Sequence, residues 1–136
     1  MAYAIKAEIR DPQASTNTLP ARKTMYGGKR IAAGDTVYIF ASENEGGPGL
    51  IARGTVTSAT PVPKIPDVER QTPRVDVEIR RDATAKRPLG RAQLKSFRDW
   101  EDGLPETELN FKLYRQATNK IVGLTDEAAS YFGTFF

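Results

Sequence analysis

Residues 36–42 constrain the fold more than any other segment, because both alternating faces of this run are apolar. Its apolar positions are Val37, Tyr38, Ile39, Phe40 and Ala41. An extended segment that is apolar on both faces must be covered on both sides, as a central strand is. Turn residues precede it at Gly34-Asp35 and follow it over 43–49. We therefore expect a buried central strand over 36–42.

Four other segments are predicted strands. Residues 3–9 alternate as a half-buried strand does, residues 50–59 are rich in β-branched residues, residues 75–80 alternate with one exposed face, and residues 120–124 fit a last strand. The second of these contains Gly54, which predicts a bulge, and it follows the loop over 43–49 closely enough to pair antiparallel with 36–42. Residues 13–23 are rich in Thr, Ser, Asn and Pro, show no periodicity, and are predicted to be a long connection.

Helical signals come late in the chain. Residues 89–97 predict a short helix or strand, and residues 106–117 fit either a helix, with Pro105 in its first turn, or a strand. We take the helix for 106–117. Thr125, followed by two acidic residues, predicts the N-cap of a last helix. With 136 residues, the chain fits a single domain over 1–136: α+β, mainly β, a small twisted barrel with flanking helices.

The chain contains no cysteine and no histidine. This removes thiolate nucleophiles, disulfides, histidine bases and nearly every zinc site, so we expect no cofactor and no metal. No phosphate-binding glycine loop or nucleophile elbow is present. The composition thus favours a binding module over an enzyme.

The net charge of +3 allows nucleic-acid binding without requiring it. Residues 80–98 carry seven basic side chains against Asp82, and the next ten residues carry five acids and no base. The basic block fits a solvated face better than a phosphate-binding surface, although both remain open. No apolar run has the length of a signal peptide or a membrane span, so we expect a cytoplasmic protein with no membrane partner.

Two patches of the sequence carry a family resemblance. Residues 34–42 (GDTVYIFAS) and 49–56 (GLIARGTV) resemble the paired strands of the PUA-like superfamily, which includes PUA, ASCH, YTH and EVE domains. Residues 120–129 (KIVGLTDEAA) are similar in order to the end of EVE domains. Where EVE domains carry a tryptophan before the GD motif, residues 25–29 read MYGGK. The resemblance implies a PUA-like pseudo-barrel that binds RNA, or a modified base in DNA or RNA, in a cleft beside the GD strand.

Stacking rings, base-edge groups and phosphate-binding cations define the candidate nucleic-acid site. The candidates are Tyr26, Lys29, Arg30, Ser42, Arg53, Trp100, Lys112, Tyr114, Arg115 and Asn119. On a helix, Lys112, Arg115 and Asn119 would share one face. Each has a plainer alternative: Ser42 as a turn cap, Arg53 as the partner of Asp35 or Glu78, Trp100 as a lid on the barrel end.

We therefore predict a module that binds a single-stranded or modified nucleotide without catalysis, with RNA or modified DNA as its partner. A small metal-independent ribonuclease, like some ASCH proteins and using Tyr26, Lys29 and Arg53, is the first alternative. A protein-interaction domain is the second. The oligomeric state does not follow from the sequence.

Overall fold

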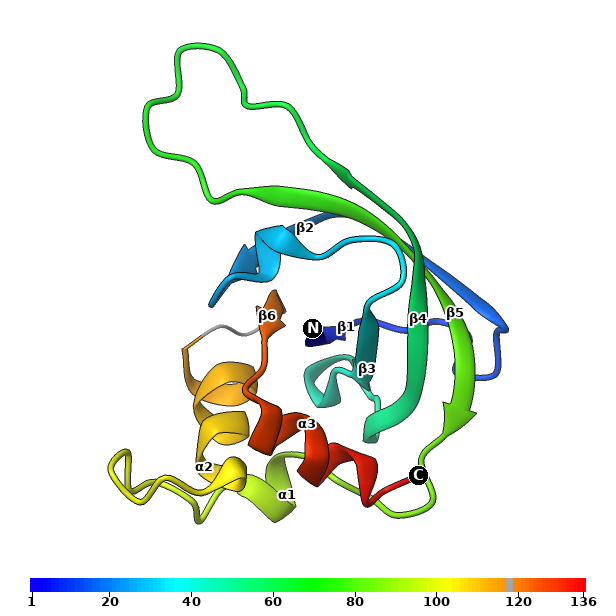
Figure 1. The fold of residues 1–136 in the computed structure, drawn as a ribbon, viewed down its shortest axis with the longest axis vertical. Coiled ribbons are helices and arrows are strands. Elements are labelled where there is room, and N and C mark those ends of the chain that lie inside the picture. The colour runs from blue at the N-terminus through cyan, green and yellow to red at the C-terminus, as the bar shows by residue number, and fades with distance from the viewer. Residues whose placement is uncertain (117–118) are drawn as a thin grey trace.

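The computed structural model describes residues 1–116 and 119–136, whose strands close into a barrel in the order β1-β3-β4-β5-β2-β6 (Figure 1). The strands are β1 (Ala2–Ala7), β2 (Thr16–Met25), β3 (Thr36–Ala41), β4 (Gly49–Pro61), β5 (Arg74–Thr84) and β6 (Ile121–Gly123). The fold expected from the sequence, a mainly β pseudo-barrel with flanking helices, is confirmed.

The barrel is mixed, and one parallel pair places the candidate site. β1 runs parallel to β3, in register from Ala2 opposite Thr36 to Ala7 opposite Ala41. β3 continues into an antiparallel pair with β4, as expected, and the pairing shifts beside Gly54, where a bulge was predicted. Because β1 and β3 run the same way, the chain leaves both strands at the same end of the barrel.

The prediction of a long connection over 13–23 is wrong, because most of this segment belongs to β2. The strand pairs with β5 and β6, and its register shifts between Leu19 and Arg22, around Pro20 and a left-handed Ala21. Only Leu19 and Thr24 are buried in it. A strand with so few inward apolar residues carries almost no periodic signal, which is why the pattern of the sequence misses it.

The expectation of one exposed face on the first strand is also wrong. The side chains of Tyr3, Ile5 and Ala7 fill the barrel interior. Ala4, on the opposite face, belongs to a second core between barrel and helices, where Tyr38 stacks on Phe132 with ring centroids 4.5 Å apart. Both faces are therefore covered, and Lys6, which shares the parity of Ala4, is buried with them.

The helices gather beside one end of the barrel (Figure 1). They are α1 (Arg91–Leu94), α2 (Pro105–Asn110), a π-helical turn η3 (Phe111–Arg115) and α3 (Asp126–Gly133), with 3-10 turns η1 (Gly28–Arg30) and η2 (Glu43–Glu45). Thr125 caps α3 as predicted, accepting the N–H of Ala128 at 3.2 Å. None of the described helices has the length and apolar character needed to cross a lipid bilayer.

The helix predicted over 106–117 is present but shorter, and its predicted last residue, Ala117, lies outside the described residues. α2 passes directly into η3, which ends at Arg115. Asn119 adopts a left-handed backbone conformation in a turn and so lies on no helix. The predicted common face of Lys112, Arg115 and Asn119 is therefore wrong.

Candidate functional site

Five polar residues lie near the barrel end where β1 and β3 stop, four of them joined by contacts and the fifth, Ser42, preceding Glu43 in the chain. They are Lys6, Ser42, Glu43, Arg91 and Tyr114, and we call them the polar cluster. Ser42 is the first residue after β3, and its N–H donates to the carbonyl of Ala7 at 2.8 Å. Its own carbonyl accepts the N–H of Gly47 at 2.8 Å, which folds the following loop back tightly. The parallel strand pair thus fixes Ser42 in place.

The Ser42 hydroxyl is buried and has no hydrogen-bond partner in the described part of the chain. The residue is 1 % exposed. A buried hydroxyl without a partner loses its hydrogen bonds to water and costs about 1–3 kcal/mol. Such groups are rare in folded proteins and call for an explanation. One explanation is a ligand atom that forms the missing hydrogen bond with this hydroxyl.

Glu43 is held from two sides. The Tyr114 hydroxyl donates to both carboxylate oxygens at 3.0 Å, and the backbone N–H of Arg91 donates to Oε2 at 2.7 Å. Burial, followed by the nearby Glu43 charge, raises the pKa of Tyr114 above its usual value, so the phenol stays protonated and donates. A Cβ on Gly90 would lie 2.7 Å from Oε2 of Glu43, so glycine leaves room for this arrangement.

Lys6 contacts the aromatic ring of Tyr114. Its ammonium is 4.3 Å from the centroid of the Tyr114 ring, and the residue is 1 % exposed. Burial lowers the pKa of Lys6, the neighbouring Arg91 lowers it further, and Glu43 partly opposes both effects. The cluster therefore combines an amine donor, a free hydroxyl and an oriented carboxylate, a set that can read hydrogen-bonding edges of a small planar ligand.

A second group of predicted residues lies elsewhere and is already engaged. The Lys112 ammonium pairs with Glu108 at 3.1 Å, donates to the carbonyl of Gly123 at 2.7 Å, and lies 4.9 Å from the Tyr26 ring centroid. The Tyr26 hydroxyl bonds to the side chain of Gln116. Tyr26 and Lys112 thus join β2, β6 and η3, and Lys112 is not a free cation.

The remaining predicted residues do not join the cluster by any contact among the described residues. Trp100 packs edge-on against Phe111, and Arg115 lies over the same ring at 5.4 Å. Arg53 does not pair with Asp35 or Glu78, the alternative expected from the sequence, but lies 5.2 Å from the ring centroid of Phe136. Three are exposed elsewhere on the chain: Lys29 and Arg30 in η1, and Asn119.

Of the ten predicted residues, two belong to the polar cluster: Tyr114, which hydrogen-bonds to Glu43, and Ser42, which precedes Glu43 in the chain. Sequence reasoning missed Lys6, Glu43 and Arg91. One feature of the sequence set Lys6 apart: it is a charged residue within β1, whose other side chains are apolar. The same pattern also fits a strand with one exposed face, so it did not identify Lys6 as buried. Arg91 belonged to the basic block, and nothing marked it among seven cations.

The basic block divides in the structure. Arg80 pairs with Asp82 at 3.1 Å on β5, whereas Arg91 and Lys95 are exposed on or next to α1. The Arg91 guanidinium lies 5.2 Å from the Tyr114 ring centroid. The α1 part of the block thus places exposed positive charge next to Tyr114 of the polar cluster.

Sequence comparison places the chain in no group: no protein-family model matches it, and no curated protein matches it significantly. Solved structures do match. The DUF55 domain of human thymocyte nuclear protein 1 superposes with a TM-score of 0.66 over 96 % of this chain and 95 % of that domain, at 19 % identity. A Pseudomonas putida protein superposes with a TM-score of 0.65 over 99 % of both chains, at 16 % identity.

A further match is human THYN1 protein in a complex with DNA that contains 5-methylcytosine. It has a TM-score of 0.64 and 16 % identity, over 98 % of this chain and 96 % of that one. At these identities the likeness establishes a shared fold. The barrel with flanking helices that the GD strand pair led us to expect is therefore shared with these solved structures.

Proposed function

We propose that this protein binds nucleic acid without catalysis and that the polar cluster receives one unstacked base. The observation that carries the proposal is the buried, unpartnered hydroxyl of Ser42 at the end of the parallel β1–β3 pair. A binding site for a polar ligand keeps such a group at a cost in stability, and the ligand supplies the missing hydrogen bond.

Each member of the cluster has a role in this proposal. The Ser42 hydroxyl donates to or accepts from the base edge, and the Lys6 ammonium donates to a ring nitrogen or carbonyl oxygen. Glu43 is fixed by Tyr114 and Arg91, and it accepts from an exocyclic amine. The guanidinium of Arg91 and the ammonium of Lys95 contact flanking phosphates.

The fold comparison supports the same ligand class. One structure of similar fold is a complex with DNA containing 5-methylcytosine. To reach the buried side chains of Lys6 and Ser42, a base must leave the helical stack, so single-stranded or flipped nucleotides are the ligands that fit. We therefore propose a modified base in DNA or RNA as the preferred ligand.

The ribonuclease alternative has no specific observation in its favour. Its three residues have other partners or none in the described structure: Tyr26 bonds Gln116, Arg53 packs on Phe136, and Lys29 is exposed. The protein-interaction alternative, in which the basic block over 80–98 is only a solvated face, has no specific observation in its favour at the polar cluster either.

The test is the anisotropy of fluorescein-labelled oligonucleotides titrated with the protein. Single-stranded and duplex DNA and RNA are used, each with cytosine or 5-methylcytosine at one central position. We expect saturable binding, tighter for one modified form, with the oligonucleotide intact afterwards. Absence of binding at low salt would overturn the proposal, and cleavage would transfer support to the ribonuclease.

The matched variants are Ser42→Ala and Ser58→Ala. Ser58 is exposed on β4, outside the polar cluster. Losing one buried hydrogen bond to the ligand should weaken the affinity of Ser42→Ala about tenfold, while Ser58→Ala binds as the wild type does. Equal affinities for the two variants would remove Ser42 from the site.

A further inference from the structure

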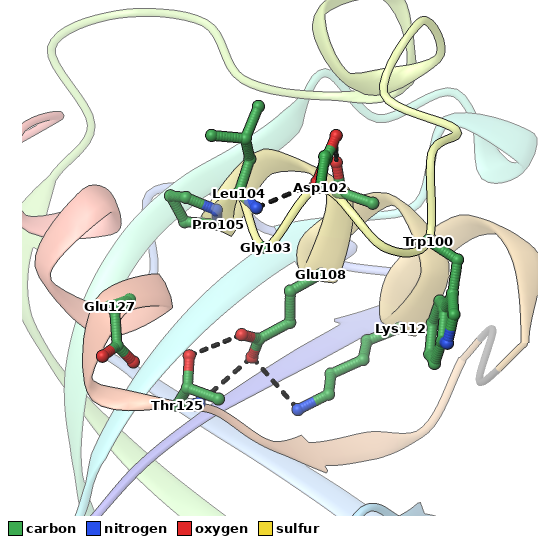
Figure 2. Close-up of a pocket in the computed structure, with 10 residues that line it drawn as sticks. Trp100, Asp102, Gly103, Leu104, Pro105, Glu108, Lys112, Thr125 and Glu127 are labelled. Atoms are coloured by element: carbon green, nitrogen blue, oxygen red, sulfur yellow. Dashed lines mark hydrogen bonds and ion pairs between the residues drawn. The ribbon is translucent and has the colours of Figure 1, made fainter.

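A cavity of about 370 Å³ opens between the loop after α1, the α2–η3 segment and the start of α3 (Figure 2). Its lining includes Trp100, Asp102, Leu104, Glu108, Lys112 and Glu127. None of the five residues of the polar cluster lines it. In Figure 2, Trp100 and Glu127 stand on opposite sides, with Glu108 and Lys112 between them.

The charge of this cavity is opposite to the charge of the chain. Three carboxylates line it against the single ammonium of Lys112, which Glu108 already neutralises in an ion pair of 3.1 Å. The exposed acids Asp99 and Glu101 flank Trp100 in the sequence. Phosphates are repelled from such a place, whereas cations are attracted.

The carboxylates differ in how far they are engaged. Glu108 accepts from Lys112 and from the N–H of Thr125, and Asp102 accepts from the N–H of Leu104 and the hydroxyl of Thr107. Glu127 forms no hydrogen bond or ion pair with residues 1–116 or 119–136, and it is exposed in the first turn of α3. Its carboxylate is the one free to bind a ligand.

The apolar side of the cavity is also uncovered. Trp100 is 61 % exposed and Leu104 is 44 % exposed, so both present apolar surface to a ligand in the cavity. Phe111 contacts the indole of Trp100 at a centroid distance of 4.7 Å and an interplanar angle of 73°. An exposed indole and a free carboxylate on opposite sides of one cavity can hold a basic side chain between them, because the carboxylate pairs with the charged group while the indole packs on the aliphatic stem.

We propose that this cavity binds an arginine or lysine side chain from a basic segment of a partner protein. The charged group pairs with Glu127, its aliphatic stem lies on Trp100 and Leu104, and neighbouring basic residues of the segment face Asp99 and Glu101. The surface is independent of the polar cluster, so one molecule can bind nucleic acid and a basic protein segment together.

The sole tryptophan makes the test direct, because Trp100 emission reports on this cavity alone. The probe is the peptide Gly-Arg-Gly-Arg-Gly, acetylated and amidated at its ends, titrated at low and moderate salt. We expect a saturable change in emission that weakens as salt rises. The Glu127→Gln variant should bind at least fivefold more weakly.

The matched control is Asp126→Asn. Asp126 is exposed in the same first turn of α3 but does not line the cavity, so both variants lose the same favourable charge at the helix N-terminus. The control should bind the peptide as the wild type does, and equal melting temperatures of the two variants show that folding is intact.

Three results would overturn the inference. The first is no emission change at millimolar peptide, and the second is equal binding by Glu127→Gln and Asp126→Asn. The third is a response to an oligonucleotide with none to the peptide, which would assign Trp100 to nucleic acid. If acetyl-arginine amide bound as tightly as the peptide, the ligand of the cavity would be a small cation and not a segment of a partner protein.

Discussion

Lys6 occupies a position where an aliphatic side chain would cost less free energy. Its ammonium is buried against the Tyr114 ring, and burial lowers its pKa. A buried charge of this kind lowers the stability of the fold unless its interactions compensate for it. Under the proposed function, a bound base would hydrogen-bond to this ammonium and to the Ser42 hydroxyl, and binding would offset part of the free energy that burial of the two groups costs.

The Lys6→Met variant tests this at neutral pH. We expect a free energy of unfolding equal to or above that of the wild type, together with at least tenfold weaker binding of the preferred oligonucleotide. Urea denaturation and anisotropy measure the two quantities. Lys23→Met, at a position of β2 outside the polar cluster, is the control and should leave both nearly unchanged.

The difference in unfolding free energy between Lys6→Met and the wild type should also depend on pH. Because the pKa of Lys6 is lowered from 10.5 in the folded state, the unfolded chain binds the extra proton, and the stability of the wild type rises with pH in the alkaline range below 10.5. The stability advantage of Lys6→Met should therefore shrink between pH 7 and pH 10. An advantage that grows with pH would contradict the lowered pKa.

Single residues were predictable where the local pattern is unambiguous. Thr125 was predicted as a helix cap because two acidic residues follow it, whereas Ser42 became a candidate through the family resemblance of the GD strand that it ends. Lys6 was missed because alternation along one strand does not tell which face a helix will cover. Which face is covered depends on the packing of β1 against helices that come much later in the chain.

At the scale of elements, β6 joins the two edges of the barrel with three residues. It pairs antiparallel with β1 and parallel with β2. A side chain on Gly123 would overlap the carbonyl oxygen of Tyr26, which accepts the N–H of Gly123 at 3.2 Å. Close approach of backbone to backbone therefore depends on glycine at this position.

The Gly123→Ala variant should lose about 3 kcal/mol or more of unfolding free energy, because the backbone must move to admit the methyl group. Gly133→Ala, at the end of α3 with open space around it, makes the same chemical change and should stabilise by up to about 1 kcal/mol. Guanidinium denaturation compares them. Equal effects would show that β6 tolerates a wider spacing.

The elements themselves were predicted unevenly. The strands with apolar periodicity, the helix within 106–117 and the cap at Thr125 were identified, since each leaves a local or periodic signal in the sequence. β2 was missed because its hydrogen bonds to β5 and β6, rather than buried side chains, hold it in the sheet. Because the helical segment ends at Arg115, Asn119 does not share a helix face with Lys112 and Arg115 as predicted.

For the whole molecule, the positions of the charged side chains are more informative than the net charge, because cations and carboxylates gather on different surfaces. Exposed cations next to the polar cluster lie in and beside α1, and the acidic cavity takes carboxylates from the α2 and α3 segments. A second group of cations lies on the long loop between β4 and β5, which projects away from the helices (Figure 1). The nucleic acid is predicted to meet the first group only.

The double variant Arg91→Ala, Lys95→Ala tests this by salt dependence. On single-stranded ligands, the slope of log affinity against log salt should fall by about 0.7 for each phosphate that the variant no longer neutralises. The matched control, Lys64→Ala with Arg70→Ala on the β4–β5 loop, should keep the wild-type slope. A reduced slope in the control alone would move the phosphate path to that loop.

The most direct measurement of the central claim is nuclear magnetic resonance of the uniformly ¹⁵N-labelled protein titrated with the preferred oligonucleotide. A base that enters the polar cluster should shift the amide signals of Ala7, Ser42, Gly90 and Arg91 most strongly. Signals of the loop over 62–73 should stay in place. Large shifts confined to that loop, or to residues around Trp100, with Ser42 unchanged, would contradict the assignment of the base site.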